Sequence, residues 1–231
     1  IAIETGYEHS VALKSDGTVR AWGRSSNAPA GLNNVIAIAA GDYHSLALTS
    51  DGTVHAWGMN NNGQSNVPAG LSNVVAIAAG GDLSLVLKND GKVAAWGSNY
   101  QGERNVPSSL NHVIAIAAGS FNAQAVKEAI TVTINQAAGQ ADPTASNPVR
   151  FDVLFSQSVA NFTASDVTLS GTANLDSATI TISGGPAAYT VNVDGVAGSG
   201  TVIATLAANV ATDANGYGNR ASTSTDNTVR F

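Results

Sequence analysis

The chain has 231 residues, no cysteine and a formal net charge of −6. The lack of cysteine excludes disulfides and thiolate sites, and the negative charge disfavours a nucleic-acid partner. Charged residues make up 11% of the chain, well below the roughly 25% of an average soluble domain. Small, polar and β-branched residues replace them, which is typical of β-rich surface proteins, so we expect an extracellular or cell-surface location. No apolar stretch is long enough to span a bilayer, and we expect no membrane insertion.

A unit of 39 residues repeats through the first half of the chain. Gly6, Gly41, Gly80 and Gly119 follow one another at spacings of 35, 39 and 39 residues, and an Asp-Gly pair and a Trp-Gly pair recur at the same offsets. Such a period indicates one supersecondary module that buries its apolar faces against its neighbours. The units are residues 1–35, 36–74 and 75–113, followed by a partial unit at 114–127.

The second unit illustrates the local pattern. An apolar run at 35–41 is followed by a second run at 44–49, the pair Asp51-Gly52 and a third run at 53–58. Two β-like runs around Asp-Gly predict a hairpin in which both central residues have positive φ. Three to four short antiparallel strands at this period predict a blade of a β-propeller. We expect Trp22, Trp57 and Trp96 to occupy equivalent, largely buried positions between blades.

These motifs also carry a family resemblance. The pattern Val-Ile-Ala-Ile-Ala-Ala-Gly, His-Ser-Leu-Ala-Leu, Ser-Asp-Gly-Thr-Val and Ala-Trp-Gly at 35–58 resembles the bacterial short form of the repeat in regulator-of-chromosome-condensation propellers, and the match spans residues 1–127. The resemblance implies blades of four strands in a ring of seven, whereas this chain holds three and a half repeats. His9 and His44 match a histidine of the family, but Leu83 and Asn122 replace it, which weakens any histidine-based site.

Residues 130–231 differ from the repeats and predict a second domain. They contain no Lys, Glu, His or Trp, and hold seven Asp against three Arg. Alternating apolar and polar segments, such as 149–155 and 201–206, predict about seven short strands, which favours an immunoglobulin-like (Ig-like) sandwich. The segments at 153–159, 162–171 and 211–219 resemble bacterial Ig-like domains, which are strung in tandem in large secreted adhesins. The predicted fold is therefore all-β, with incomplete propeller blades at 1–129 and an Ig-like β-sandwich at 130–231.

Few residues are candidates for a chemical site. Carboxylates in flexible Asn/Gly-rich turns suit calcium, although Asp is also a common turn former. The candidates are Asp142, Asp166, Asp213 and Asp226. Calcium is the one cofactor that the sequence suggests. His9 and His44 stand at strand starts, where a structural role is favoured over catalysis. No nucleophile, phosphate-binding or paired-carboxylate motif is present, so we expect a protein that is not an enzyme.

The missing blades suggest a function. Three and a half sheets cannot close a ring, so the end sheets would expose apolar faces and unpaired edges. The first hypothesis is a structural subunit of an extracellular fibre or sheath, a homopolymer in which the strand Ile1-Ala2-Ile3 of one subunit completes the partial fourth blade of the next. The alternative is a protein- or glycan-binding module of a larger secreted adhesin. Tyr100, the single aromatic residue in the inter-blade loops, argues against that alternative.

Overall fold

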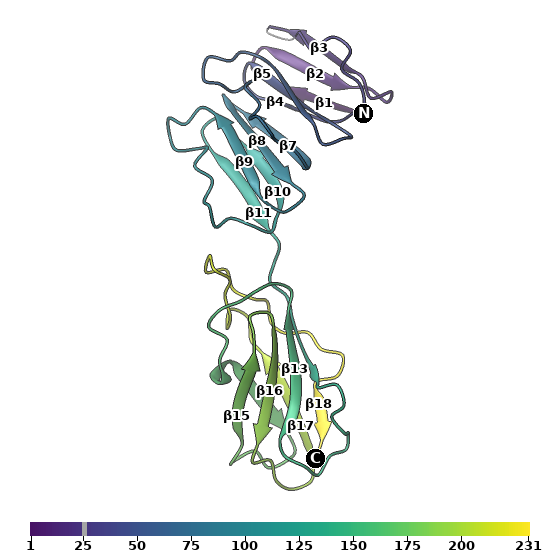
Figure 1. The fold of residues 1–231 in the computed structure, drawn as a ribbon, viewed down its shortest axis with the longest axis vertical. Helices are drawn as coiled ribbons and strands as arrows, with labels where there is room; N and C mark the ends of the chain where they lie inside the picture. The colour runs from purple at the N-terminus through teal and green to yellow at the C-terminus, as the bar shows by residue number, and fades with distance from the viewer. Residues whose placement is uncertain (25–26) are drawn as a thin grey trace. The chain divides into compact units, whose positions relative to one another are not determined.

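The structure is a computed structural model that describes residues 1–24 and 27–231. The chain divides into two compact units, Ile1–Glu128 and Ala129–Phe231 (Figure 1). The boundary predicted after residue 129 lies one residue away. None of the described residues belongs to a helix with the length and apolar character needed to cross a membrane.

The described residues of the first unit form three sheets of three antiparallel strands and a fourth sheet of two. The strands are β1 (Ala2–Thr5), β2 (His9–Leu13) and β3 (Val19–Gly23); β4 (Val35–Ala40), β5 (His44–Thr49) and β6 (Val54–Gly58); β7 (Val74–Gly80), β8 (Leu83–Lys88) and β9 (Val93–Gly97); and β10 (Val113–Ala118) and β11 (Ala123–Lys127). Each sheet keeps chain order, so the second strand of each repeat lies in the middle of every complete sheet.

Each complete blade has three strands among the described residues, whereas the family resemblance implied four. The segments after β6 and β9 form turns instead, and asparagine side chains bond within each of these two segments. The side-chain nitrogen of Asn60 donates to Asn66 at 2.7 Å, and that of Asn99 donates to Asn105 at 3.1 Å. Asn side chains that bond locally compete with a ladder of backbone hydrogen bonds.

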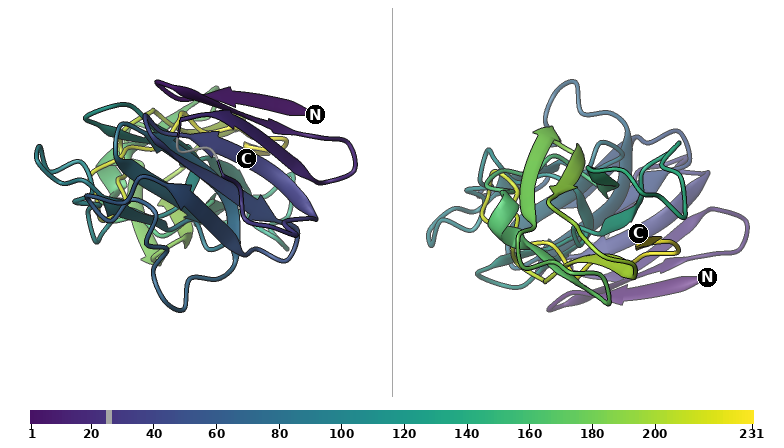
Figure 2. Two further views of the ribbon diagram at one scale, coloured as in Figure 1. Left: turned by 90° about the horizontal axis from the view of Figure 1, so that it is seen from above. Right: turned by 90° about the horizontal axis from the view of Figure 1, so that it is seen from below.

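The sheets of the first unit follow one another in chain order, each packed on the next (Figure 2). Every residue of β5 is buried, because this strand lies in the middle of its sheet and has a sheet on either side. Ala47 belongs to the core shared with the first sheet, whereas Leu46 and Leu48 belong to the core shared with the third. Period-two alternation therefore supplies two apolar faces, one for each neighbour.

The three tryptophans stand at equivalent positions, as predicted, but they are not equally buried. Trp22, Trp57 and Trp96 pair with Ser10, Ser45 and Ser84 in the same register. Trp57 and Trp96 are each 6% exposed, whereas Trp22 is 50% exposed. Trp57 and Trp96 each pack against the preceding sheet, whereas no described residues form a sheet before that of Trp22. The prediction of burial was therefore wrong for Trp22.

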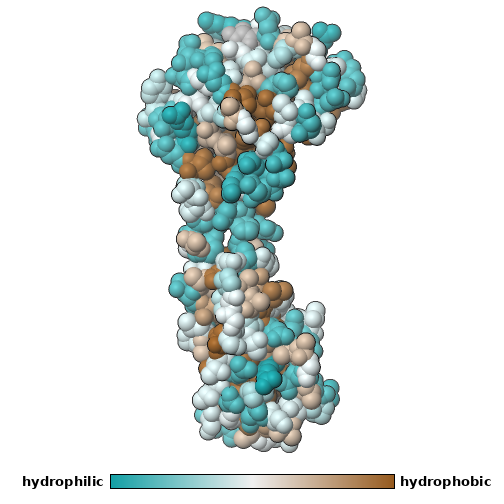
Figure 3. All heavy atoms as spheres, in the orientation of Figure 1, coloured by the Kyte–Doolittle hydropathy of each residue, from teal (hydrophilic) through white to brown (hydrophobic). Residues whose placement is uncertain are grey.

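Both end sheets of the first unit expose apolar side chains. Ile3 is 63% exposed and Val126 is 57% exposed, and brown apolar atoms reach the surface of this unit in Figure 3. Ile1-Ala2-Ile3, the strand expected to complete the fourth blade of the next subunit, lies at the edge of the first sheet, and its donation stays a prediction. β1 is already paired with β2 in its own sheet, with Ala2 opposite Leu13.

The second unit consists of two antiparallel sheets and a single 3-10 turn. The first sheet has the order β12 (Val132–Gln136), β13 (Val149–Phe155), β16 (Ala188–Asp194), β15 (Thr179–Gly184); the second has the order β14 (Val167–Gly171), β17 (Thr201–Leu206), β18 (Thr228–Arg230); and the 3-10 turn is η1 (Ala164–Asp166). The seven strands agree with the number predicted, and β13 and β17 have the predicted bounds.

One core fills the space between these two sheets. Residues of β13 alternate between buried and exposed along the whole strand, which agrees with the period-two pattern in the sequence. Val132 and Phe151 face Val202 and Val229 in the same cluster. At one end the rings of Phe155, Phe162 and Tyr189 pack edge to face, with centroids 5.0 to 5.9 Å apart.

Candidate functional site

The repeated histidines join neighbouring sheets. Nε2 of His9 lies 2.8 Å from Oγ of Ser45, and Nε2 of His44 lies 2.9 Å from Oγ of Ser84. The Ser84 hydroxyl in turn donates to the carbonyl of Gln64 at 2.9 Å, so His44 Nε2 is the donor to Ser84. The ring needs the glycine before it, since a Cβ on Gly41 would lie 2.2 Å from Cε1 of His44. This chain of bonds supports the structural interpretation of both histidines.

Burial keeps these histidines neutral. His44 is fully buried. Desolvation lowers its pKa to about 4; the Asp82 charge opposes this shift to a smaller extent, and His9 adds slightly to it. Burial also lowers the pKa of His9. Nδ1 of His44 has no hydrogen-bond partner among residues 1–24 and 27–231. A buried ring with no path to solvent serves packing, and we assign it no catalytic role.

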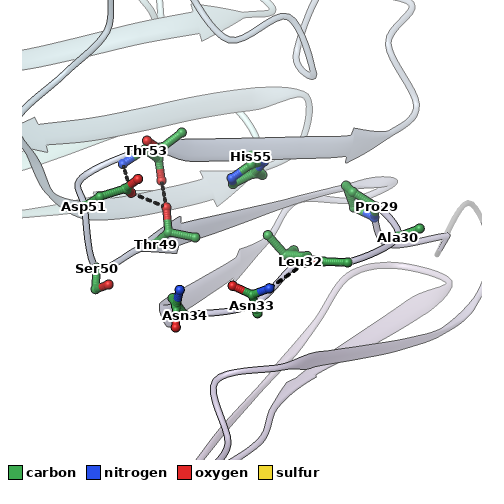
Figure 4. Close-up of a pocket in the computed structure, with 11 residues that line it drawn as sticks. Pro29, Ala30, Leu32, Asn33, Asn34, Thr49, Ser50, Asp51, Thr53 and His55 are labelled. Carbon is green, nitrogen blue, oxygen red and sulfur yellow. Dashed lines mark hydrogen bonds between the residues drawn. The ribbon is translucent and has the colours of Figure 1, made fainter.

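The Asp-Gly turns are also structural. The carboxylate of Asp51 accepts hydrogen bonds from the Thr49 hydroxyl at 2.7 Å and from the Thr53 amide at 3.0 Å (Figure 4). Only the glycine of the turn has positive φ, 82° at Gly52, so the prediction of positive φ at both central residues was wrong. A three-residue loop in which glycine takes the left-handed position closes the hairpin instead. The cavity beside it, of about 410 Å³, offers His55 and a carboxylate that the turn already uses.

The four aspartates proposed for calcium do not come together. Asp142 accepts a hydrogen bond from the Arg230 amide, Asp166 from the Thr163 amide, and Asp213 from the amides of Asn215 and Tyr217, while the amide of Asp226 donates to Asn135. Within the described part of the chain, no three His, Cys, Asp or Glu side chains lie close enough to hold a metal ion. Calcium binding at these residues stays a prediction.

An exposed cluster of aromatic and charged side chains lies where the first and second strands of the first two repeats are joined. The rings of Tyr7 and Tyr43 pack edge to face with centroids 5.7 Å apart. The guanidinium of Arg24 lies 5.8 Å from the centre of the Tyr43 ring, and its Nη1 bonds to the Glu8 carboxylate at 2.9 Å. Tyr7 is 73% exposed. We call these four residues the tyrosine cluster.

Backbone hydrogen bonds between neighbouring repeats fix the position of the tyrosine cluster. The Tyr7 amide donates to the carbonyl of Asp42, and the Asp42 amide donates to the carbonyl of Gly81, each at 2.9 Å. The Arg24 amide donates to the Glu8 carbonyl, also at 2.9 Å. Desolvation, followed by the negative charge of Glu8, raises the pKa of Tyr43 further above neutral pH, and its phenol is a hydrogen-bond donor there. The cluster is therefore a preorganised surface of two aromatic rings beside an Arg–Glu ion pair.

The sequence did not predict this cluster, because the aromatic residue singled out there, Tyr100, lies in the loops that follow the tryptophans and not in the turns that contain Tyr7 and Tyr43. Tyr100 donates to the side chain of Asn62 at 3.2 Å. Tyr7 directly follows the glycine of its repeat, whereas Tyr43 comes two residues after its glycine. Because the two tyrosines do not align, comparison of the repeats position by position could not reveal them as a pair. The available signal was the presence of an aromatic residue within two positions of each of these glycines.

A comparison with protein-family models decides the type of repeat. The model for the Regulator of chromosome condensation (RCC1) repeat matches residues 1–28, 35–64 and 74–103. The first unit carries RCC1-type repeats. The matched segments contain the three complete sheets, and they include Tyr7, Tyr43 and Arg24 of the tyrosine cluster. Comparison with curated proteins gave no match.

Several solved structures resemble parts of the chain. The CRINKLY WD40 ectodomain of the Arabidopsis thaliana receptor kinase ACR4 is 26% identical, with 54% of this chain and 44% of that chain covered and a TM-score of 0.44. Prp20p from Saccharomyces cerevisiae is 19% identical, with coverage of 83% and 55% and a TM-score of 0.48. The ectodomain of the Physcomitrella patens receptor kinase CR4 is 20% identical, with coverage of 69% and 52% and a TM-score of 0.49. This chain spans about half the length of these structures.

Proposed function

We propose that this chain is a protein-binding module, without enzymatic activity, that acts outside the cell or at its surface. The observation that carries the proposal is the tyrosine cluster on the RCC1-type repeats. Tyrosine and arginine are enriched among the residues that contribute most to protein interfaces. A cluster held by backbone bonds between repeats loses little conformational freedom when a partner binds.

A protein partner fits the tyrosine cluster better than a glycan does. Sugar rings stack on open aromatic faces, but Arg24 lies over Tyr43 and Tyr7 meets that ring at an interplanar angle of 66°. The exposed side chains leave a guanidinium, a phenol and a carboxylate for polar contacts. This arrangement suits a protein surface that pairs an apolar anchor with a hydrogen-bonding rim.

The remaining parts of the proposal rest on the sequence and on the second unit. Low charge and the lack of cysteine support a bacterial surface location, and the net charge of −6 speaks against a nucleic-acid partner. Seven strands in two sheets around one core support an Ig-like class for residues 130–231. In this proposal that unit belongs to the body of a larger adhesin, and the repeats carry the binding surface.

Selection of binding peptides tests the proposed function. A phage-displayed random peptide library selected on the intact chain is expected to yield sequences whose affinity falls about tenfold or more with Tyr43→Ala. Tyr217→Ala is the matched control, because Tyr217 is 54% exposed on the second unit, and it should leave binding unchanged. Peptides that bind both variants equally, or a glycan array that binds in a Tyr43-dependent manner, would contradict a protein-binding role for the cluster.

The structural subunit of a fibre or sheath is the second candidate, favoured by the exposed end sheets. Because Trp22 and Val126 are 50% and 57% exposed at opposite ends of the repeat array, head-to-tail contact of copies would bury both. Sedimentation velocity over a micromolar concentration series is expected to give growing species in this case. A single monomeric boundary at all concentrations would rule the fibre out.

A further inference from the structure

The fourth sheet of the first unit lacks its third strand, and the place of that strand remains open. β11 pairs with β10, and no other described strand pairs with β11. After β11 the chain continues into β12, which pairs with β13 in the second unit. Four of the five β11 residues are exposed, whereas every residue of the equivalent strand β5 is buried.

A cavity of about 290 Å³ lies beside β11, close to the lower limit of about 300 Å³ for small-ligand pockets. Its apolar lining includes Leu85 and Val93 from the third sheet, and Val106 and Leu110 from the loop that follows. One repeat earlier, the equivalent residues occupy the same core as Trp96. They are Leu46, Val54, Val67 and Leu71. The cavity is therefore the position of a tryptophan that the fourth sheet does not supply.

The filled site of Trp96 defines the polar requirements of the open one. Nε1 of Trp96 donates to the carbonyl of Gln64 at 2.9 Å, and Glu103 stands at the equivalent place in the open site. Gly97 follows with φ 105°, and a Cβ there would lie 2.2 Å from the carbonyl of Asp82. Phe121 stands at the position equivalent to Asp82. In the open site its carbonyl would leave no room for a Cβ either, so the residue that follows an added tryptophan must be glycine.

We propose that this open site binds an extended segment of another polypeptide that carries the sequence Val-x-Ala-Trp-Gly. The segment adds to the outer edge of β11, along residues 123–126, as an antiparallel strand. Its tryptophan enters the cavity against Leu85, Val93, Val106 and Leu110 and donates to the carbonyl of Glu103. The three complete repeats contain this sequence at 19–23, 54–58 and 93–97. We therefore expect the open site to prefer the sequence that forms the third strand in the complete sheets of the same molecule. The open site and the tyrosine cluster are separate. A selected peptide that binds at the open site loses affinity with Val106→Asp and not with Tyr43→Ala, so it does not count against the cluster, and the two proposals can fail independently.

Fluorescence anisotropy with a synthetic strand tests the proposal on the intact chain. The probe is a fluorescein-labelled peptide with the sequence of residues 92–98, Lys-Val-Ala-Ala-Trp-Gly-Ser. We expect it to bind, and we expect replacement of its tryptophan by alanine to weaken binding about tenfold or more. Val106→Asp in the chain should weaken binding comparably, because the charge enters the apolar lining of the cavity.

Val126→Asp is the matched control. Val126 lies on the opposite face of β11, at the position that Leu48 and Leu87 hold in the inner sheets, and is 57% exposed. This variant should bind the peptide normally, and near-native thermal midpoints will show that both variants fold. Hydrogen exchange should show new protection at residues 123–127 in the presence of the peptide. No binding, equal binding of the Trp and Ala peptides, insensitivity to Val106→Asp, or protection at 19–23 instead would each overturn the proposal.

Discussion

Replacement of Trp96 by alanine is expected to lower the free energy of unfolding of the first unit by about 3–5 kcal/mol, the range for removing a large buried aromatic side chain. Trp96 is 6% exposed, lies in the core between the second and third sheets and bonds through Nε1 to the Gln64 carbonyl. The substitution therefore creates a cavity and leaves that carbonyl with one hydrogen bond fewer. Urea unfolding followed by tryptophan fluorescence measures the effect on the first unit alone, since residues 130–231 contain no tryptophan.

Trp22→Ala is the matched control for this experiment. The side chain occupies the same strand position but is 50% exposed, so its removal should cost about 1 kcal/mol or less. The difference between the two variants measures what a neighbouring sheet adds to one tryptophan. Equal losses of stability would show that the tryptophan acts within its own sheet, and the packing described for the repeats would be wrong.

Acidification is expected to destabilise the first unit by about 3 kcal/mol through His44 between pH 6.5 and pH 4. The folded-state pKa of about 4 lies below the ordinary value of 6.5, so the unfolded chain binds the proton first. The stability contributed by neutral His44 is fully present above pH 6.5 and is lost as the pH falls toward 4. The physical cause is burial, since protonation at Nδ1 would place a charge where no described residue offers a hydrogen bond.

The third repeat supplies the substitution that tests this effect. Leu83 replaces the histidine there and is fully buried, so His44→Leu should fold and should flatten the dependence of stability on pH between 6.5 and 4. His112→Asn is the control, because His112 is exposed and has a positive φ of 51°, which asparagine tolerates. Urea unfolding midpoints measured at several pH values give the pH dependence of stability for both variants. An unchanged slope in His44→Leu would assign the acid sensitivity to other groups.

The repeat period by itself determined the order of elements in the first unit. Spacing of the glycine, Asp-Gly and Trp-Gly motifs placed the strands and the two-strand fragment at the end, because each motif has a local conformational cause. Glycine allows positive φ or the close approach of two backbone segments. Alternation along the strand places Leu46 and Ala47 on opposite faces of the sheet. The same alternation predicted β13 and β17 to their bounds.

Only the tertiary structure decided what depends on a neighbour. Trp22 and Trp96 share the motif Val-x-Ala-Trp-Gly. Trp22 is nevertheless exposed and Trp96 buried, because burial depends on whether a preceding sheet packs against the tryptophan. The pairing of Tyr7 with Tyr43 arises from hydrogen bonds between turns of different repeats. The open site beside β11 exists because β12 joins another sheet. The repeat period shows which positions are equivalent, but it does not show which side chains of neighbouring repeats come into contact.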